Sequence, residues 1–253
     1  MYVSHKHIRK VRGFLVSSNE LSARVAVVAG ASGLVGSECL RQLLRSSDYN
    51  QVIAMVRRPL ETSHPKLFQI NVDFSNLPIR SEFVGADVFS ALGSTMKQAG
   101  SREAFRRVDY DAILSFAKVA AEGGARQFVV VSSIGANSHS ATFYLKVKGE
   151  LEDALRSLPF RALHIFRPSF LAGDRGVSRP AERVGTAVAK AFDFAFVGKL
   201  KKYSAVDVCE LAAAMLSAAR HAEPGTHTYD YEQILSLAKS RTEPWNENVS
   251  QSE

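Results

Sequence analysis

Short apolar runs alternate along the chain with longer segments whose apolar residues recur at helical spacing. The run 24–29, Arg-Val-Ala-Val-Val-Ala, is typical of a strand buried on both faces of a parallel sheet. Leu34, Leu40, Leu43 and Leu44 follow it at helical spacing. Further strands are predicted at 51–56, 67–72, 87–92, 127–132 and 161–166, and further helices at 103–122 and 143–158. This alternation predicts an α/β fold with a doubly wound parallel sheet.

After residue 167 the strand-like runs thin out and helical patterns dominate. We interpret this part as a small, mostly helical C-terminal substrate cap, with helices predicted at 181–192, 206–220 and 231–239. It is too short and too dependent on the sheet to form a separate domain. We therefore expect one domain over 1–253, with a core at 24–167, a cap region at 168–240, and flexible tails at 1–22 and 241–253.

The composition is that of an ordinary globular protein of 253 residues, with 46% hydrophobic and 23% charged residues. No apolar run approaches the roughly 18 to 20 residues that a membrane span needs, and the basic start of the chain lacks the apolar core of a signal peptide. Cys39 and Cys209 show no metal-binding or disulfide spacing. We therefore expect no membrane or metal site, and a reducing, cytoplasmic location.

The formal net charge of +7 raises the question of nucleic-acid binding. The basic residues are scattered, and their densest cluster, Lys199, Lys201 and Lys202, is not interleaved with a strip of aromatic residues. We therefore expect no nucleic-acid partner. A basic pocket suits a cofactor that carries several phosphate charges.

Three glycines at a spacing of three, Gly30, Gly33 and Gly36, lie between the first predicted strand and the first predicted helix. In this setting the backbone turns tightly, and the N–H groups and positive dipole at the helix start bind a nucleotide's phosphates. The alternative is a turn whose glycines serve only packing. Ala31 and Ser32 separate the first two glycines, where the dinucleotide fingerprint has one residue, and this wider spacing resembles that of short-chain dehydrogenases.

A second cofactor signal follows the second predicted strand, where Arg57 and Arg58 stand about twenty residues beyond the last glycine. Arginine offers a fork of donors that pairs with a ribose 2′-phosphate, so these residues favour NADP(H) over NAD. The alternative is a solvated charge pair at a strand end. Asp73 is a candidate for the adenine amino group, and Leu92-Gly93 a candidate for the path to the nicotinamide ribose.

Tyr144 and Lys148 are four residues apart in a predicted helix, so both side chains lie on one face. A tyrosine hydroxyl can act as acid or base on an alcohol or carbonyl oxygen when a neighbouring ammonium stabilises its phenolate. Ser133, or its neighbour Ser132, ends the preceding strand and would hold that oxygen as negative charge develops. The alternative is an ordinary helix tyrosine beside a solvated lysine.

These motifs together resemble the atypical short-chain dehydrogenases, and within them the group of the Tat-interacting oxidoreductase, over most of residues 24–220. The resemblance is carried by the glycine turn from Gly30, Arg57-Arg58, Leu92-Gly93-Ser94-Thr95, Ala99-Gly100, Arg107-Val108-Asp109, Ser132-Ser133, Tyr144 to Glu150, and Phe166-Arg167-Pro168. It implies a Rossmann-type sheet and NADPH held by Ser32, Gly33, Leu34, Val35, Arg57, Arg58, Leu92, Gly93, Tyr144 and Lys148, with further contacts from Leu171 and Arg179. One departure is Asp109, where many short-chain dehydrogenases carry an asparagine that supports a proton relay.

Two functions follow from this reading. The first is an NADP(H)-dependent oxidoreductase of a small carbonyl or alcohol substrate, with Tyr144, Lys148 and Ser133 as the catalytic residues. The second is a non-catalytic NADPH-binding sensor or regulator that acts through a protein partner, since a competent cofactor site does not guarantee turnover. The sequence leaves open the substrate and whether the protein is a monomer or a homodimer.

Overall fold

The computed structural model describes residues 24–79, 81–172 and 204–240. Its main feature is a sheet of seven parallel strands in the order β3-β2-β1-β4-β5-β6-β9. The strands are β1 (Arg24–Ala29), β2 (Tyr49–Val56), β3 (Leu67–Asn71), β4 (Asp87–Ser90), β5 (Gln127–Val131), β6 (Ala162–Phe166) and β9 (Gly225–Tyr229). The chain builds outward on one side of β1 and then returns to build on the other side from β4. This doubly wound, Rossmann-type order confirms the predicted fold class and puts a crevice at the carboxyl ends of β1 and β4.

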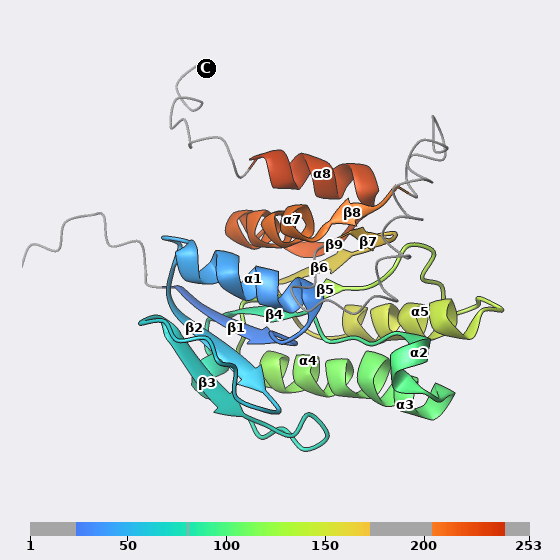
Figure 1. Ribbon diagram of the computed structural model, residues 1–253, viewed down its shortest axis with the longest axis horizontal. Coiled ribbons are helices and arrows are strands. Elements are labelled where there is room, and N and C mark those ends of the chain that lie inside the picture. Colours follow the sequence, from blue (N-terminus) through green and yellow to red (C-terminus); the bar gives the residue numbers. More distant parts are fainter. Residues whose placement is uncertain (1–23, 80, 173–203, 241–253) are drawn as a thin grey trace, which may run out of the picture.

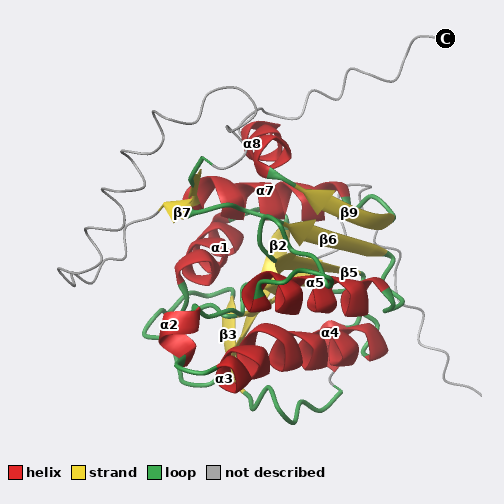
Figure 2. Ribbon diagram, turned by 90° about the vertical axis from the view of Figure 1, so that its right-hand side faces the viewer, coloured by secondary structure: helices red, strands yellow, loops and turns green. Residues whose placement is uncertain are grey.

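Helices cover both faces of the sheet (Figure 1). One face carries α1 (Leu34–Arg45) and α7 (Val208–His221), and the other carries α4 (Ile113–Glu122) and α5 (Phe143–Arg156). Figure 2 shows the same layers from the side, with α8 (Tyr231–Ser240) outside α7. Adjacent residues of β1 point to opposite cores, Val28 into the α1/α7 layer and Val27 into the α4/α5 layer. The continuous apolar run of β1 is explained by this double burial.

The C-terminal part differs from the sequence-based expectation in one element. Gly225–Tyr229 was not predicted as a strand, yet it pairs with β6 along its full length, from Ala162 opposite Gly225 to Phe166 opposite Tyr229. Its sequence, Gly-Thr-His-Thr-Tyr, has no apolar alternation, and its position comes from the backbone hydrogen bonds that β6 offers. The predicted helices 206–220 and 231–239 correspond to α7 and α8. The predicted helix 181–192, the lysine cluster at 199–202 and both predicted tails lie outside the described residues.

Shorter elements lie in the connections between the strands and helices. They are a single turn of 3₁₀ helix (Ser81–Phe83), α2 (Met96–Ala99), α3 (Arg102–Arg106), a π-helical segment (Arg107–Ala112), β7 (Leu171–Ala172) and β8 (Val206–Asp207). The predicted helix 103–122 is therefore found as one run made of α3, the π-helical segment and α4. The strands β7 and β8 pair with each other and not with the main sheet. A substrate-covering role for 168–240 stays a prediction, because residues 173–203 are outside the described part of the chain.

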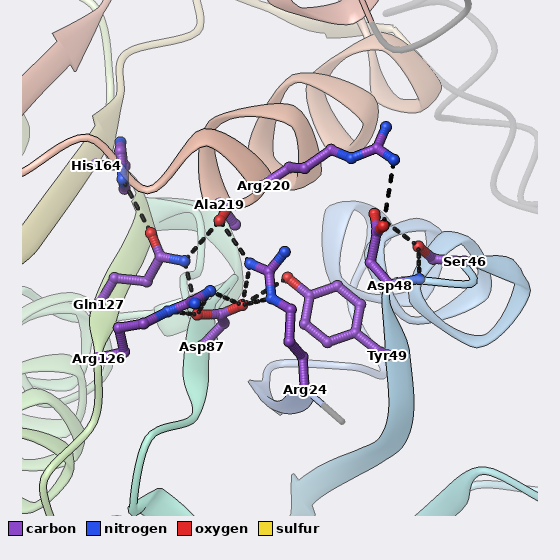
Figure 3. Close-up of polar contacts among 10 residues, drawn as sticks. All are labelled: Arg24, Ser46, Asp48, Tyr49, Asp87, Arg126, Gln127, His164, Ala219 and Arg220. Carbon is purple, nitrogen blue, oxygen red and sulfur yellow. Dashed lines mark hydrogen bonds and ion pairs between the residues drawn. The ribbon is translucent and has the colours of Figure 1, made fainter. Parts of the chain in front are cut away.

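A polar cluster around Asp87 ties together the amino ends of the strands (Figure 3). The buried Asp87 carboxylate accepts hydrogen bonds from Arg24 (Nη2, 2.6 Å), Tyr49 (Oη, 2.9 Å), Arg126 (Nε, 2.9 Å) and Gln127 (Nε2, 2.6 Å). Such a buried charge is tolerated only because it is paired with cations and fully hydrogen-bonded. The cluster lies at the end of the sheet opposite the crevice, so we assign it to stability.

His164 extends this network toward β9. Because Gln127 Nε2 already donates to Asp87 and to the Ala219 carbonyl, its oxygen faces His164 Nε2 at 3.1 Å. The ring therefore donates from Nε2 and accepts at Nδ1 from the Tyr229 hydroxyl, at 2.9 Å. Burial, assisted by the charge of His227, lowers the pKa of His164 to about 4.

We expect His164 to make folding weaker in mild acid. Its pKa is lower in the folded protein than the usual value of 6.5, so the unfolded chain takes up a proton first as the pH falls below about 6.5, and stability is lost down to about pH 4. In urea unfolding, His164 should lower the free energy of unfolding by about 2 kcal/mol between about pH 7 and about pH 5. His164→Gln should remove that part of the pH dependence, whereas His139→Gln, at an exposed position, should keep it. Equal pH dependence in wild type and His164→Gln would contradict the assignment.

Candidate dinucleotide site

The three glycines of the turn after β1, Gly30, Gly33 and Gly36, differ in what a side chain would meet at each position. Gly30 has a φ of +84°, and a Cβ there would lie 2.5 Å from the Ala91 carbonyl oxygen in the loop after β4. A Cβ at Gly36 would lie 2.0 Å from the Gly30 carbonyl oxygen, so this glycine lets α1 pack against the strand end. Gly33 is exposed, and a Cβ there would meet only the Gly30 oxygen, at 3.3 Å. The chain itself hardly requires Gly33 to be a glycine, which fits the close approach of a ligand from outside.

The start of α1 is suited to a phosphate group. Gly33 is its N-cap residue and provides no side-chain hydrogen bond, and the first turn holds no acidic residue. Ser32 is exposed and Leu34 half-buried, while the Val35 side chain is buried in the core, so Val35 can meet a ligand only through its backbone. Uncapped N–H groups at the positive end of a helix dipole bind anions. The glycine turn therefore fits the pyrophosphate of a dinucleotide.

Arg57 and Arg58 lie beside this turn. Both are exposed and directly follow β2, whose Met55 is paired with Ala29 at the end of β1. Within the described residues neither arginine forms an ion pair with a carboxylate, which leaves both guanidinium groups open to an anion. Their predicted role at a 2′-phosphate is compatible with this position.

Asp73, the predicted adenine contact, follows β3 on the same edge of the sheet. Its Oδ1 accepts hydrogen bonds from the backbone N–H of Ser75 (2.9 Å) and from the Ser75 hydroxyl (2.7 Å). These bonds lower the pKa of Asp73, and they close the turn after β3. A contact with adenine stays a prediction.

The predicted catalytic residues come from the start of α5 and from the end of β5. Tyr144 lies in the first turn of α5, half-buried, with its ring 5.4 Å from the ring of Phe105. Lys148 follows one turn later, is buried, and has its Nζ 2.8 Å from Asp109 Oδ1. Ser133 comes two residues after the last residue of β5. One helix and one strand thus contribute these residues to the same end of the sheet.

Backbone contacts hold the segment after β5 against α5 and against the loop after β6. The Asn137 N–H donates to the Leu145 carbonyl of α5 (3.1 Å), and the Ile134 N–H donates to the Pro168 carbonyl after β6 (2.9 Å). Gly149 makes this possible, because a Cβ there would lie 2.1 Å from the backbone of Asn137. The turn of α5 that carries Lys148 is therefore pressed against the segment that follows Ser133.

The structure separates the roles of the two neighbouring serines. The Ser132 hydroxyl donates to Oε1 of Glu152 at 2.6 Å, and the buried Glu152 is also held by Arg167, at 2.9 and 2.6 Å. Within the described part of the chain, the Ser133 hydroxyl makes one hydrogen bond, a long one of 3.3 Å to the Ile134 carbonyl. Ser132 is thus engaged in a structural network, and Ser133 keeps a hydroxyl for another partner. Glu152 was missed from sequence, although a charged residue four positions after Lys148, on the same helix face, was a usable signal.

The remaining predicted cofactor residues follow other strands on the same edge. Leu92 and the exposed Gly93 lie in the loop after β4, and Leu171 lies in β7, after β6. Arg179 lies outside the described residues. Among the residues that the structure describes, no group of three or more His, Cys, Asp or Glu side chains is placed to hold a metal ion. No helix in the described ranges is long and apolar enough to cross a bilayer.

Fold and glycine turn together define a Rossmann-type dinucleotide-binding protein. The sequence model of the NAD(P)H-binding family matches residues 30–190, and the chain belongs to this family. Solved structures with similar folds include MoeE5 in complex with UDP-glucose and NAD (TM-score 0.61, 17% identity, 86% of this chain and 81% of that chain). Another is the Bordetella bronchiseptica enzyme WbmH in complex with NAD⁺ (TM-score 0.62, 16% identity, 86% and 80%). At this identity the likeness concerns the fold.

Relatives of higher identity support the resemblance drawn from the motifs. The rat protein HTATIP2 is 39% identical over 160 residues, which cover 61% of this chain and 66% of the rat protein. Protein FMP52, mitochondrial, of Coccidioides immitis is 32% identical over 226 residues, 83% of this chain and 92% of the fungal protein. The similarity to an atypical short-chain dehydrogenase group is thereby confirmed.

The expected cytoplasmic location is wrong. The FMP52 relatives of Coccidioides immitis, Debaryomyces hansenii and Candida albicans are all named mitochondrial. The expectation rested on two cysteines without metal-binding or disulfide spacing and on the lack of a secretory signal pattern. Such cysteines suit a reducing environment, and they do not distinguish one reducing compartment from another.

Proposed function

We propose that this protein is an NADP(H)-dependent oxidoreductase that reduces a small carbonyl compound or oxidises the corresponding alcohol. The observation that carries the proposal is the placement of Tyr144, Lys148 and Ser133 at the crevice edge that also holds the glycine turn. In open α/β sheets, ligands bind at this edge, where the strand order reverses. A dinucleotide with its pyrophosphate at α1 has its other half free to extend along the edge toward α5.

Each residue has a defined part in the reduction. When bound, NADPH supplies the hydride that adds to the carbonyl carbon. Ser133 donates a hydrogen bond to the carbonyl oxygen and so stabilises the negative charge that develops there. Tyr144 gives its phenolic proton to that oxygen, which completes the alcohol, and the phenolate then recovers a proton from solvent. Lys148 stabilises the phenolate by its charge and offers N–H groups to ribose hydroxyls.

The choice of NADP(H) over NAD(H) is part of the proposal. Arg57 and Arg58 are exposed beside the glycine turn, and an acidic residue that would accept bonds from a ribose 2′-hydroxyl does not occupy either position. A guanidinium group pairs with a 2′-phosphate through charge-assisted hydrogen bonds. The basic character of the chain, with a formal net charge of +7, agrees with an anionic cofactor.

A second candidate is a non-catalytic NADPH sensor acting through a protein partner. It is favoured by Asp109, which stands where many short-chain dehydrogenases carry an asparagine that supports a proton relay. Such a protein would bind NADPH with the same glycine turn and arginines and would not turn over a substrate.

One experiment separates the two candidates. Binding of NADPH to the full chain is first measured by a titration that monitors cofactor fluorescence. The protein is then assayed with NADPH against a panel of aldehydes, ketones and quinones. We expect binding together with turnover of at least one carbonyl class. Binding without turnover across the panel would favour the sensor, and failure to bind either NADPH or NADH would overturn both.

A further inference from the structure

Asp109 occupies an unusual place in the long helical run that begins at Arg102. It lies in the π-helical segment Arg107–Ala112, between α3 and α4. A π-helical turn inserts an extra residue into a helix, and such insertions often occur at functional sites. Asp109 is fully buried, and its side chain points from this insertion to the edge of the sheet where Lys148 lies.

The two carboxylate oxygens of Asp109 contact two different segments. Oδ1 is 2.8 Å from Nζ of Lys148 in α5. Oδ2 accepts hydrogen bonds from the backbone N–H and the hydroxyl of Ser94, each at 2.8 Å, in the loop after β4. Gly93 leaves room for this arrangement, since a Cβ there would lie 3.3 Å from Oδ1 and 3.9 Å from Nζ. One side chain therefore links the long helix, the loop after β4 and α5.

A buried ammonium needs a charged or polar partner, since removing it from water without one is costly. Among the described residues, Asp109 is the carboxylate that forms an ion pair with Lys148. An ammonium has three N–H donors, so the contact with Asp109 leaves donors for other acceptors. The ion pair fixes Nζ beside the loop after β4, where a Cβ on Gly93 would lie 3.9 Å from it, and the Lys148 side chain is buried.

We propose that Asp109 is a positioning residue of the redox site, which acts through Lys148. Its carboxylate holds the ammonium, and with it the loop at Gly93 and Ser94, in the arrangement that cofactor and phenolate require. The Asp109 carboxylate, in direct contact with the Lys148 ammonium, thus stands where many short-chain dehydrogenases have an asparagine. The expected effect of Asp109 on turnover rests on the proposed function. The expected effect of Asp109 on NADPH affinity requires only that the protein binds NADPH.

The test is a double-mutant cycle read by NADPH affinity. Asp109→Asn keeps the size of the side chain but removes its charge. Its amide NH₂ group then faces either the Lys148 ammonium or the Ser94 N–H, which are themselves donors. Lys148→Gln keeps a donor toward Asp109, so that the buried carboxylate is not left without a partner. We expect Asp109→Asn to weaken NADPH binding about tenfold in the wild-type background and less than about threefold in the Lys148→Gln background. Asp111→Asn is the matched control, because Asp111 is exposed in the same π-helical segment and should leave the affinity unchanged.

A merely structural role would give a different result. If Asp109→Asn weakens NADPH binding by less than about threefold in the wild type, or by the same factor in both backgrounds, the positioning role is wrong. Where carbonyl turnover is measured, Asp109→Asn should lower kcat about tenfold with the carbonyl KM within about twofold. A protein that binds NADPH without turnover would refute the proposed catalytic function, and the affinity cycle would still decide the role of Asp109.

Discussion

Replacing Tyr144 with phenylalanine is expected to lower kcat for carbonyl reduction about 1000-fold, while NADPH affinity changes by less than about twofold. The substitution removes the proton that the carbonyl oxygen must receive, and it keeps the ring that packs against Phe105 at 5.4 Å. Folding and the cofactor turn should therefore be preserved. Steady-state kinetics with the best carbonyl substrate and a fluorescence titration with NADPH measure the two quantities separately.

The matched control is Tyr110→Phe. Tyr110 is a half-buried tyrosine of the π-helical segment, with the Arg106 guanidinium 4.2 Å from its ring centre, a contact that does not require the hydroxyl. The kcat of the Tyr110→Phe variant should stay within about twofold of wild type. Turnover by Tyr144→Phe at the rate of the control would show that another group donates the proton, and a loss confined to NADPH affinity would make Tyr144 a binding residue only.

Replacing both Arg57 and Arg58 with alanine is expected to weaken NADPH binding about 100-fold and NADH binding less than about twofold. Hydrogen bonds to charged groups contribute about 1.5 to 3 kcal/mol each, and the two cofactors differ only by the 2′-phosphate. Because both arginines are exposed, the lower end of that range applies to each, and the total of about 3 kcal/mol corresponds to a factor on the order of 100. Dissociation constants for both cofactors at one fixed ionic strength provide the measurement.

Arg45→Ala serves as the control for this experiment. Arg45 is exposed in the last turn of α1, at the opposite end of the helix from the glycine turn, and its removal changes the net charge without changing the predicted phosphate site. It should leave both affinities within about twofold. Equal binding of NADPH and NADH by the wild type, or an equal loss for both cofactors in the double variant, would contradict a 2′-phosphate site.

The parts of the site that depend on short-range chemistry could be read from the sequence. The strand before Gly30 and the helix after Gly36 are each defined by apolar residues at their own period, and the glycines mark the turn between them. The doubly wound parallel class follows from the same alternation of strands and helices, and the order of the strands comes from the structure. Lys148 and Tyr144 share a helix face by spacing alone.

The strand β9 shows where the local pattern was insufficient. Its residues, Gly225–Tyr229, have no apolar alternation, and a polar segment of five residues reads as a loop. It becomes a strand because β6 presents unpaired backbone groups along its edge, and this partner lies more than fifty residues earlier in the chain. Backbone pairing at a sheet edge is independent of side-chain pattern, so propensity could not reveal it.

The sequence by itself determined the α/β class, the glycine turn between β1 and α1, and the placement of Tyr144 and Lys148 on one helix face, because each depends on residues close to one another in the chain. The tertiary structure alone decided which polar groups meet across the sheet edge. It placed Asp109 in an ion pair with Lys148 and the Ser132 hydroxyl in a hydrogen bond to Glu152. The Ser133 hydroxyl makes one long hydrogen bond among the described residues. These contacts join separate segments, and a buried charge selects its partner by where the folded backbone brings it, which no local pattern encodes.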